Sequence, residues 1–342
     1  MRAIQQQRWG GPETMQLVEV DRPQPTYTEV LVKVVAAGVN PVDHYNREGK
    51  AYNDVLPLPF VNGWDVAGVV EEVGYGVTRF EPGDRVFGMP WFPRAAGAYA
   101  EYVTAPSRHF AAIPEGVSFT QAAALPLAAL TAWQMLVDVG QVRPGQRVLV
   151  SAAAGGVGHL AVQIAKSIGA YVIGTARAAK HEFLTGLGAD ETIDYTSTDV
   201  PATVRDIDIA IQMFGGEPAL RTLETLRPGG ILINAQAAWT PGMYKRAAEL
   251  GVRASAFLVE PDRANLESLA DLVAKGQLTA HIGGLLPLGP YTHQRERRVR
   301  AGNCRSAGRR TTTAAHLAGA RLWRTFGSGG DGDLPLVDRE FR

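Results

Sequence analysis

The chain has 342 residues, no formal net charge, and 46% hydrophobic against 20% charged residues, the composition of a globular protein of about two domains. This neutral balance argues against a generally basic nucleic-acid-binding protein, so we expect no nucleic-acid partner. The single cysteine, Cys304, excludes an internal disulfide framework and a multi-cysteine zinc site, and it is typical of a cytoplasmic protein, whose thiols stay reduced.

Residues 1–115 carry mainly strand and turn signals. The stretches 30–35 and 66–73 are apolar and rich in valine, and 97–103 alternates in the manner of a half-buried strand. Glycine and proline separate these runs, as they do in β-proteins with tight turns. We therefore predict an irregular, β-rich first domain.

From about residue 120, predicted helices and strands alternate along the chain. The predicted strands are 147–150, 171–174, 207–211 and 230–234, and the predicted helices are 121–137, 158–168, 179–187, 218–226 and 265–275. This alternation is typical of an α/β protein with a doubly wound parallel sheet. The uncharged stretches 117–137 and 148–165 are interrupted by Pro126 and by glycines, so we expect neither to span a membrane.

The segment 289–342 differs from the rest of the chain. It contains 11 arginines, five acidic residues and no lysine, and it has little periodicity. One interpretation is a basic nucleic-acid-binding tail. We favour another, that an Arg, Gly, Ala and Thr mixture is typical of a GC-rich gene read in a shifted frame.

A glycine-rich turn follows the predicted strand 147–150. Residues 151–158 read SAAAGGVG and contain the A-x-G-x-x-G form of the dinucleotide fingerprint, directly before a predicted helix. Small residues let the backbone approach a pyrophosphate, and the helix N-terminus offers free N–H groups to it. The residues assigned to this contact are Ala154, Gly155, Gly156, Val157 and Gly158.

The end of the second predicted strand indicates which nucleotide binds. NAD sites carry an acidic residue there for the ribose, and the stretch 173–180 has none. Arg177 and Lys180 could bind a 2′-phosphate instead, and Thr175 could donate a hydrogen bond. The alternative is that both cations are merely solvated at a helix start. We expect NADPH, and we also assign Asn234, which ends the strand 230–234, to the cofactor site.

Four stretches together resemble one protein family. They are residues 38–43 (GVNPVD), 63–70 (GWDVAGVV), 98–103 (AYAEYV) and 154–166, which begins AGGVG. In this combination they are similar to the zinc-independent quinone oxidoreductase (zeta-crystallin-like) branch of the medium-chain dehydrogenase/reductase superfamily. The resemblance covers about residues 1–288.

The resemblance implies a two-domain organisation. It places a GroES-like catalytic domain at residues 1–122 and a Rossmann dinucleotide-binding domain at 123–284. Residues 285–342 should return to the first domain, although the family's closing motif is missing from them, so its last strand would be absent or replaced. Relatives form homodimers through an edge strand, for which 252–259 is the candidate.

The same resemblance implies that no metal takes part. Zinc-dependent relatives have a cysteine ligand where this chain has Asn40 and a histidine ligand where it has Trp64, and neither residue present is a zinc ligand. Residues 87–97 lack the cysteines of a structural zinc loop. The scattered histidines His44, His109 and His159 are expected at the surface or in turns.

The family's substrate cleft would be lined by Asn40, Asp43, Tyr45 and Tyr52. The alternative is that Asn40 and Asp43 cap a turn and that the tyrosines only pack. Two further residues come from the resemblance. Thr131 is similar to a residue that contacts the nicotinamide half of the cofactor, and Tyr195 to one beside the adenine ribose phosphate.

The implied activity is NADPH-dependent reduction of a quinone or a similar conjugated carbonyl, and three alternatives stay open. One is an enoyl or enone reductase of a biosynthetic pathway, which uses the same fold and cofactor. Another is a non-catalytic, crystallin-like NADPH-binding protein. A third, a nucleic-acid-binding oxidoreductase, would use the basic tail.

Overall fold

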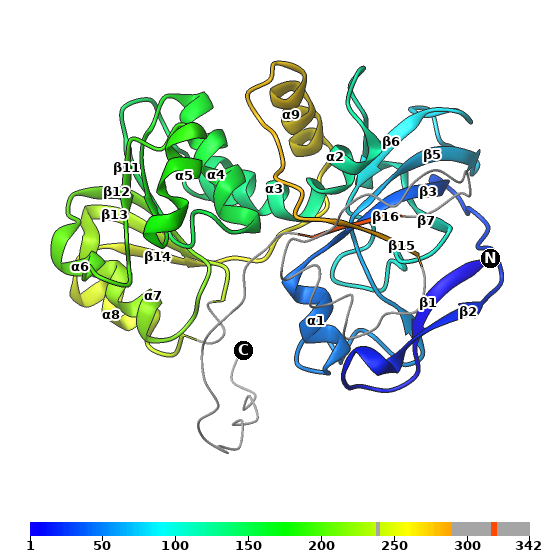
Figure 1. Ribbon diagram of the computed structural model, residues 1–342, viewed down its shortest axis with the longest axis horizontal. Coiled ribbons are helices and arrows are strands. Elements are labelled where there is room, and N and C mark those ends of the chain that lie inside the picture. Colours follow the sequence, from blue (N-terminus) through cyan, green and yellow to red (C-terminus); the bar gives the residue numbers. More distant parts are fainter. Residues whose placement is uncertain (237–239, 289–315, 320–342) are drawn as a thin grey trace.

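The computed structural model describes residues 1–236 and 240–288, together with the backbone of 316–319. The two interpretations of residues 289–342, a basic tail or a segment read in a shifted frame, therefore concern residues outside the described ranges, except for that short strand. Figure 1 shows two lobes, one built on an antiparallel-rich sheet and one on a parallel sheet, with helix α3 between them.

The first lobe contains two sheets. A three-stranded antiparallel sheet has the order β2-β1-β4, and a larger sheet has the order β15-β16-β3-β5-β6-β8, with β7 also paired to β3. The strands are β1 (Arg2–Gln6), β2 (Met15–Glu19), β3 (Glu29–Val39), β4 (Phe60–Val61), β5 (Val66–Val73), β6 (Arg85–Gly88), β7 (Tyr102–Pro106), β8 (Phe110–Ala112), β15 (Leu285–Pro287) and β16 (His316–Gly319). These sheets confirm the β-rich first half.

One strand prediction in this lobe is wrong in its position. The alternating stretch 97–103 becomes regular strand only from Tyr102, where β7 pairs with β3. Before it, Tyr99 accepts from Ile4 and donates to Asn62 through its backbone, and Ala100 forms an isolated bridge with Ala3. The alternation of apolar and polar residues in 97–103 therefore arises because this segment passes between the two sheets, and it does not indicate one continuous strand.

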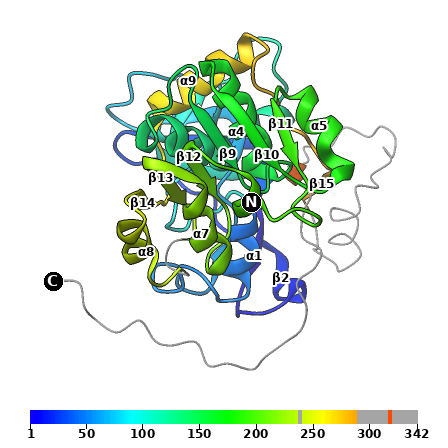
Figure 2. The same ribbon diagram turned by 90° about the vertical axis from the view of Figure 1, so that its left-hand side faces the viewer.

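The second lobe is a six-stranded parallel sheet with the order β11-β10-β9-β12-β13-β14 (Figure 2). Its strands are β9 (Arg147–Val150), β10 (Tyr171–Thr175), β11 (Glu191–Ile193), β12 (Ile207–Gln212), β13 (Leu226–Asn234) and β14 (Arg253–Ala256). The chain order reverses between β9 and β12, which is where doubly wound sheets open a crevice for ligands. The predicted fold class, a Rossmann sheet beside a β-rich lobe, is confirmed.

Four of the five predicted helices are confirmed, and helices at 41–47, 200–203 and 243–249 lie outside the predicted ranges. The described helices are α1 (Pro41–Arg47), α2 (Phe119–Ala123), α3 (Pro126–Trp133), α4 (Gly156–Ile168), α5 (His181–Gly186), α6 (Val200–Thr203), α7 (Glu217–Thr222), α8 (Met243–Glu249) and α9 (Arg263–Ala274). The single helix predicted at 121–137 is divided, because Pro126 starts a new helix and a π-helix covers Gln134–Val139. No helix in the described ranges has the length and apolar character needed to cross a membrane.

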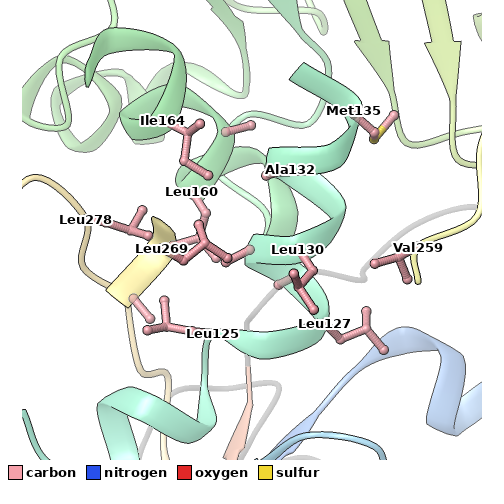
Figure 3. Packing of buried hydrophobic residues seen from close by; sticks show 14 of the residues in the cluster. Leu125, Leu127, Leu130, Ala132, Met135, Leu160, Ile164, Val259, Leu269 and Leu278 are labelled. Atoms are coloured by element: carbon pink, nitrogen blue, oxygen red, sulfur yellow. The ribbon is translucent and has the colours of Figure 1, made fainter. Parts of the chain in front are cut away.

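The two lobes share one apolar core. A single cluster of buried side chains runs from Trp64 and Phe87 in the first lobe to Leu160 and Ile164 on α4. Figure 3 shows how leucines of the α3 segment meet side chains of α4 and α9 in this cluster. Helix α3 is therefore anchored on both sides, and residues on it keep a fixed position between the lobes.

Candidate cofactor and substrate site

The glycine-rich turn leads directly from β9 into α4. Gly155 has extended backbone at the N-cap, and α4 then runs for 13 residues until Gly169 ends it at φ +91°. A Cβ atom on Gly158 would lie only 2.4 Å from the carbonyl oxygen of Ala152, so only glycine fits there. The free N–H groups of the first turn of α4 thus lie at the carboxyl end of β9, which is the geometry of a pyrophosphate site.

Hydrogen bonds fix this turn to its neighbours. The Ala153 N–H donates to the Thr175 carbonyl at the end of β10 over 2.9 Å. On the other side, the Ser151 hydroxyl is 2.6 Å from the Gln212 side-chain oxygen and accepts from the Met213 N–H at 2.9 Å. The turn is therefore held at the crevice where the sheet order reverses.

The predicted phosphate-binding residues lie together at the end of β10. Thr175 is buried, Arg177 is exposed, and the Lys180 ammonium lies 6.0 Å from the centre of the Phe183 ring. Tyr195, at 47% exposure, follows β11 on the neighbouring strand. The structure therefore gathers these residues on one side of the glycine-rich turn.

Sequence reasoning missed an acidic residue in this region. Asp194 lies at the end of β11 and accepts from the Ala178 N–H at 2.9 Å and from both the N–H and hydroxyl of Thr196. The side-chain hydrogen bond from Thr196, followed by the backbone ones, holds the pKa of Asp194 below its usual value. Both carboxylate oxygens are engaged by the protein. The acidic residue of an NAD site is expected at the end of the second strand, β10, whereas this carboxylate comes from the end of the adjacent strand, β11.

Asn234 lies in a different setting from the one expected of a cofactor contact. It is fully buried, and its amide donates to the Thr240 hydroxyl at 2.9 Å while its side-chain oxygen accepts from the Gln236 N–H at 2.8 Å. These bonds hold the chain that follows β13. A direct contact of this side chain with the nucleotide stays a prediction.

The predicted substrate residue Asp43 and a second aspartate, Asp65, are both buried. Asp43 Oδ2 accepts from the Asn40 N–H at 2.6 Å and from the Tyr99 hydroxyl at 2.7 Å. The Asn40 amide donates to Asp65 Oδ2 at 2.8 Å, and Asp65 Oδ1 accepts from the Leu127 N–H at 2.7 Å. A continuous chain of hydrogen bonds thus joins the start of α1 to the start of α3.

These hydrogen bonds show that Asn40 and Asp43 cap the start of α1, which was the alternative to lining a substrate cleft. Asn40 is the N-cap residue of α1, and the Asp43 side chain bonds back to its N–H. The importance of Asp65 and Tyr99 was missed, because sequence alone does not show that four positions far apart share one buried site. Contact of Asn40 or Asp43 with a substrate stays a prediction.

Burial raises the pKa of Asp43 and of Asp65 to about 7 in each case. Among the residues that the structure describes, neither carboxyl has an ion-pair partner, and the buried Asp43 Oδ1 has no hydrogen-bond partner. Desolvation penalises the charged form more than the hydrogen bonds favour it. Near neutral pH, this site therefore gains or loses protons.

We expect the pair to make the folded protein less stable as pH rises. The folded-state pKa values of about 7 exceed the ordinary value of 3.8, so the folded protein holds protons that the unfolded chain releases between these values. The free energy of unfolding is therefore largest below about pH 4 for this contribution and falls until the pH passes about 7.

Asp43→Asn tests this dependence. The new amide oxygen can take the place of Oδ2, and the amide nitrogen takes the place of the unpartnered Oδ1. Urea unfolding at about pH 5 and about pH 8 should show a smaller loss of stability in the variant than in the wild type. Parallel pH curves for the two proteins would contradict this assignment.

Tyr45 and Tyr52 lie on and just after α1. Partial burial raises the pKa of both hydroxyls, and for Tyr45 the charge of Lys50 acts in the opposite direction. Tyr52 has a left-handed backbone, φ +42°, and its ring meets Phe92 edge-on at 5.6 Å. Phe92 in turn lies 5.4 Å from the buried Trp64 ring. Both tyrosines remain protonated at neutral pH and can donate hydrogen bonds.

Thr131 lies on α3, between the two lobes. Its hydroxyl donates to the Leu127 carbonyl at 2.7 Å, one turn earlier in the helix. The Leu127 N–H is the group that Asp65 accepts from. The candidate nicotinamide contact and the buried carboxyl network therefore share the same helix.

The prediction that His44, His109 and His159 lie at the surface or in turns is wrong for His159, which is buried within α4, whereas His109 ends a short 3-10 turn. His109 and His159 are 7% and 5% exposed, and only His44 is partly accessible. The His109 ring accepts from the Trp91 N–H at 3.2 Å, and His159 bonds at both ring nitrogens. Within the part of the chain that the structure describes, no group of three or more His, Cys, Asp or Glu residues could hold a metal ion.

Comparison with known proteins gives consistent matches. Residues 26–115 match the family model of the alcohol dehydrogenase GroES-like domain, and residues 187–290 match that of the zinc-binding dehydrogenases. The quinone oxidoreductase of Mus musculus is 35% identical over 308 residues, which cover 84% of this chain and 91% of the mouse protein.

Solved structures agree in fold. The quinone oxidoreductase from Coxiella burnetii matches with a TM-score of 0.82 and 32% identity, covering 93% of this chain and 98% of the other. The Escherichia coli quinone oxidoreductase complexed with NADPH matches at 0.78 and 27%, covering 93% and 100%. An NAD-dependent alcohol dehydrogenase also matches at 0.78 and 32%, covering 93% and 99%.

Proposed function

Since the chain belongs to the zeta-crystallin-like quinone oxidoreductases of the medium-chain dehydrogenase/reductase superfamily and is an oxidoreductase that uses a nicotinamide cofactor, we propose that it reduces a quinone with NADPH and without zinc. The observation that carries the proposal is the glycine-rich turn at residues 151–158, which lies at the crevice of the parallel sheet. Only glycine fits at position 158 of this turn, because a side chain there would collide with the backbone of Ala152. We propose the catalytic domain at residues 1–122 with a return from 285, and the cofactor domain at 123–284.

NADPH fits the residues at the end of β10 better than NADH. Arg177 and Lys180 follow directly after β10, where the proposed site would hold the ribose, and a 2′-phosphate is recognised by such cations. The Asp194 carboxylate already accepts from Ala178 and Thr196 and so has little capacity for a ribose hydroxyl.

Zinc independence rests on which groups occupy the positions of the zinc ligands. Asn40 gives an amide hydrogen to Asp65, and the Trp64 indole is buried and donates to the Arg94 carbonyl at 2.8 Å. Neither side chain is a ligand that zinc uses in proteins. We propose that hydrogen-bond donors of the protein polarise the substrate carbonyl instead.

The proposed chemistry assigns a role to each cleft residue. NADPH, when bound, supplies the hydride. Tyr45 keeps its proton at neutral pH and can donate it to the oxygen on which negative charge develops. Asn40 is held by Asp43 and Asp65 and has a second amide hydrogen to offer. Tyr52, packed against Phe92, provides an aromatic wall suited to a planar acceptor.

The proposal is tested by following NADPH and NADH oxidation with quinones and with enones, with and without a chelator. We expect turnover of quinones with NADPH that the chelator does not reduce. A preference for enones would identify the protein as a C=C reductase of the same family. Nucleotide binding without any turnover would instead indicate a crystallin-like, non-catalytic protein.

Arg177→Ala and Lys180→Ala are expected to weaken NADPH binding selectively. Loss of one charge-assisted contact to a phosphate should lower the NADPH affinity about 10- to 100-fold, because such bonds contribute about 1.5–3 kcal/mol. The NADH affinity of the same variants is the control and should change little. Fluorescence titration measures both, and an equal loss for the two nucleotides would argue against a 2′-phosphate contact.

Two further expectations belong to this proposal. We propose a homodimer joined along β14, because this strand is the edge of the six-stranded sheet and lies within the predicted segment 252–259. Light scattering during gel filtration would measure the assembly. We also propose a cytoplasmic location, which the single cysteine of the sequence favours.

A further inference from the structure

We propose that His159 is a positioning residue for the nucleotide, because it ties the glycine-rich turn to the segment through which the chain returns to the catalytic lobe. This inference rests on the proposed binding of NADPH at that turn. The histidine lies in the first turn of α4, and its side chain is buried.

Both ring nitrogens of His159 are engaged by backbone groups of different segments. Nδ1 lies 2.8 Å from the Gly155 carbonyl oxygen, within the glycine-rich turn. Nε2 lies 3.0 Å from the backbone nitrogen of His281, 122 residues later in the chain. A single imidazole therefore connects the N-cap of α4 with the connection between α9 and β15.

The partners determine the form of the ring. The His281 N–H can only donate, so Nε2 has to be the unprotonated acceptor, and Nδ1 carries the hydrogen that Gly155 accepts. A protonated imidazolium would lose the bond from His281. Burial, with a smaller contribution from the nearby His281 ring, also holds the pKa of His159 below its ordinary value, so the neutral ring persists at neutral pH.

The return segment is held in the same way by two glutamines. Gln163, one turn further along α4, donates to the Thr279 carbonyl and accepts from its N–H, both at 3.0 Å. Gln121 of α2 makes the same pair of bonds with Ala280, at 2.9 and 3.2 Å. Residues 279–281 are thus bound by side chains at three successive positions, and His159 alone extends this attachment to the nucleotide turn.

The surroundings of the ring lead toward the proposed phosphate site. Phe183 packs against both His159 and His281, with ring centres 6.3 and 5.3 Å away, and the Lys180 ammonium lies 6.0 Å from the centre of the Phe183 ring. A shift of the His159 ring would therefore disturb both the pyrophosphate turn and the position of Lys180.

Two near-isosteric substitutions separate the two bonds. In His159→Asn, the amide nitrogen can replace Nδ1 and still donate to Gly155, but nothing accepts from the His281 N–H. In His159→Gln, the amide oxygen can replace Nε2 and accept from His281, but the donor to Gly155 is lost. His159→Leu removes both bonds and replaces the ring with an apolar side chain of similar volume.

The experiment combines amide hydrogen exchange of the nucleotide-free protein with NADPH titration. We expect faster exchange of residues 279–281 in the Asn and Leu variants but not in the Gln variant. We expect the Kd and KM for NADPH to rise about tenfold in all three variants, with kcat unchanged, because each variant breaks the connection between Gly155 and His281 at one end or at both.

The outcomes decide between positioning and packing. A wild-type Kd for NADPH in the Leu variant, or in either the Asn or the Gln variant, overturns the proposal. If the wild type binds no NADPH, the proposed function fails, and unchanged exchange of 279–281 in all three variants then overturns the tie itself. The expected exchange pattern in that case would retain the tie and reject only its nucleotide role.

Discussion

Gly158→Ala should abolish nucleotide binding and lower the free energy of unfolding by about 1–3 kcal/mol. The added methyl would lie 2.4 Å from the Ala152 carbonyl oxygen and 2.7 Å from the Ala153 Cα atom, and both are backbone atoms that cannot rotate away. Helix α4 would have to move away from β9. Its free N–H groups would then no longer point at the pyrophosphate, so we expect an NADPH affinity at least about 100-fold lower.

Gly186→Ala is the matched control for this substitution. Gly186 is the last residue of α5, and a Cβ atom there has no other atom within 4 Å. Alanine at this position should leave NADPH binding unchanged and have little effect on stability, or raise it slightly. Calorimetry and titration of both variants provide the comparison, and similar losses in the two would mean that the close packing at Gly158 is unimportant.

Asp65→Leu is expected to have the second large effect. The carboxylate accepts from the Leu127 N–H at the start of α3 and from the Asn40 amide, and leucine would leave both buried donors without a partner. Each such donor costs about 1–3 kcal/mol, so we expect a stability loss of about 2–5 kcal/mol. The rate of quinone reduction should fall as well, since Asn40 and α3 would lose the bond that fixes them relative to one another.

Two other substitutions test whether the lost hydrogen bonds cause the lower stability of Asp65→Leu. Asp65→Asn restores an acceptor for one of the two donors and should recover part of the lost stability. Asp43→Asn serves as the comparison for stability, because both bonds to Asp43 end on one oxygen, which an amide can replace. If Asp65→Leu were as stable as Asp43→Asn in urea unfolding, the link between α1 and α3 would not matter for the fold.

Features set by local sequence could be predicted well. The strands β5, β9 and β10, the helix α4 and its glycine-rich turn agree with the predicted ranges to within about two residues. In these places, three signals agree with one another: the runs of β-branched residues, the spacing of the glycines, and the alternation of predicted strands with predicted helices. The grouping of Thr175, Arg177 and Lys180 also follows from their place directly after one strand.

Features set by distant residues could not be predicted. Asp65, Tyr99 and Leu127 lie far apart in the sequence. Asp65 and Tyr99 bond to the Asn40–Asp43 turn and Leu127 bonds to Asp65, and these contacts depend on how the lobes pack. The same reason explains the buried setting of His159, whose partner His281 is 122 residues away. A single sequence shows the polar residue but neither its burial nor the backbone group that it meets.

The division of strands between the two sheets affects the order in which the chain can assemble. All six strands of the parallel sheet come from Arg147–Ala256, so every pairing in it closes within one continuous stretch of chain. In the larger sheet of the first lobe, β3 pairs with β16, and Ala36 meets His316. On the ribosome, the parallel sheet therefore has all its strands while the other sheet still lacks its last partner. The earliest-made part of the polypeptide is completed last, after a loop closure of about 280 residues that costs more chain entropy than any pairing in the parallel sheet.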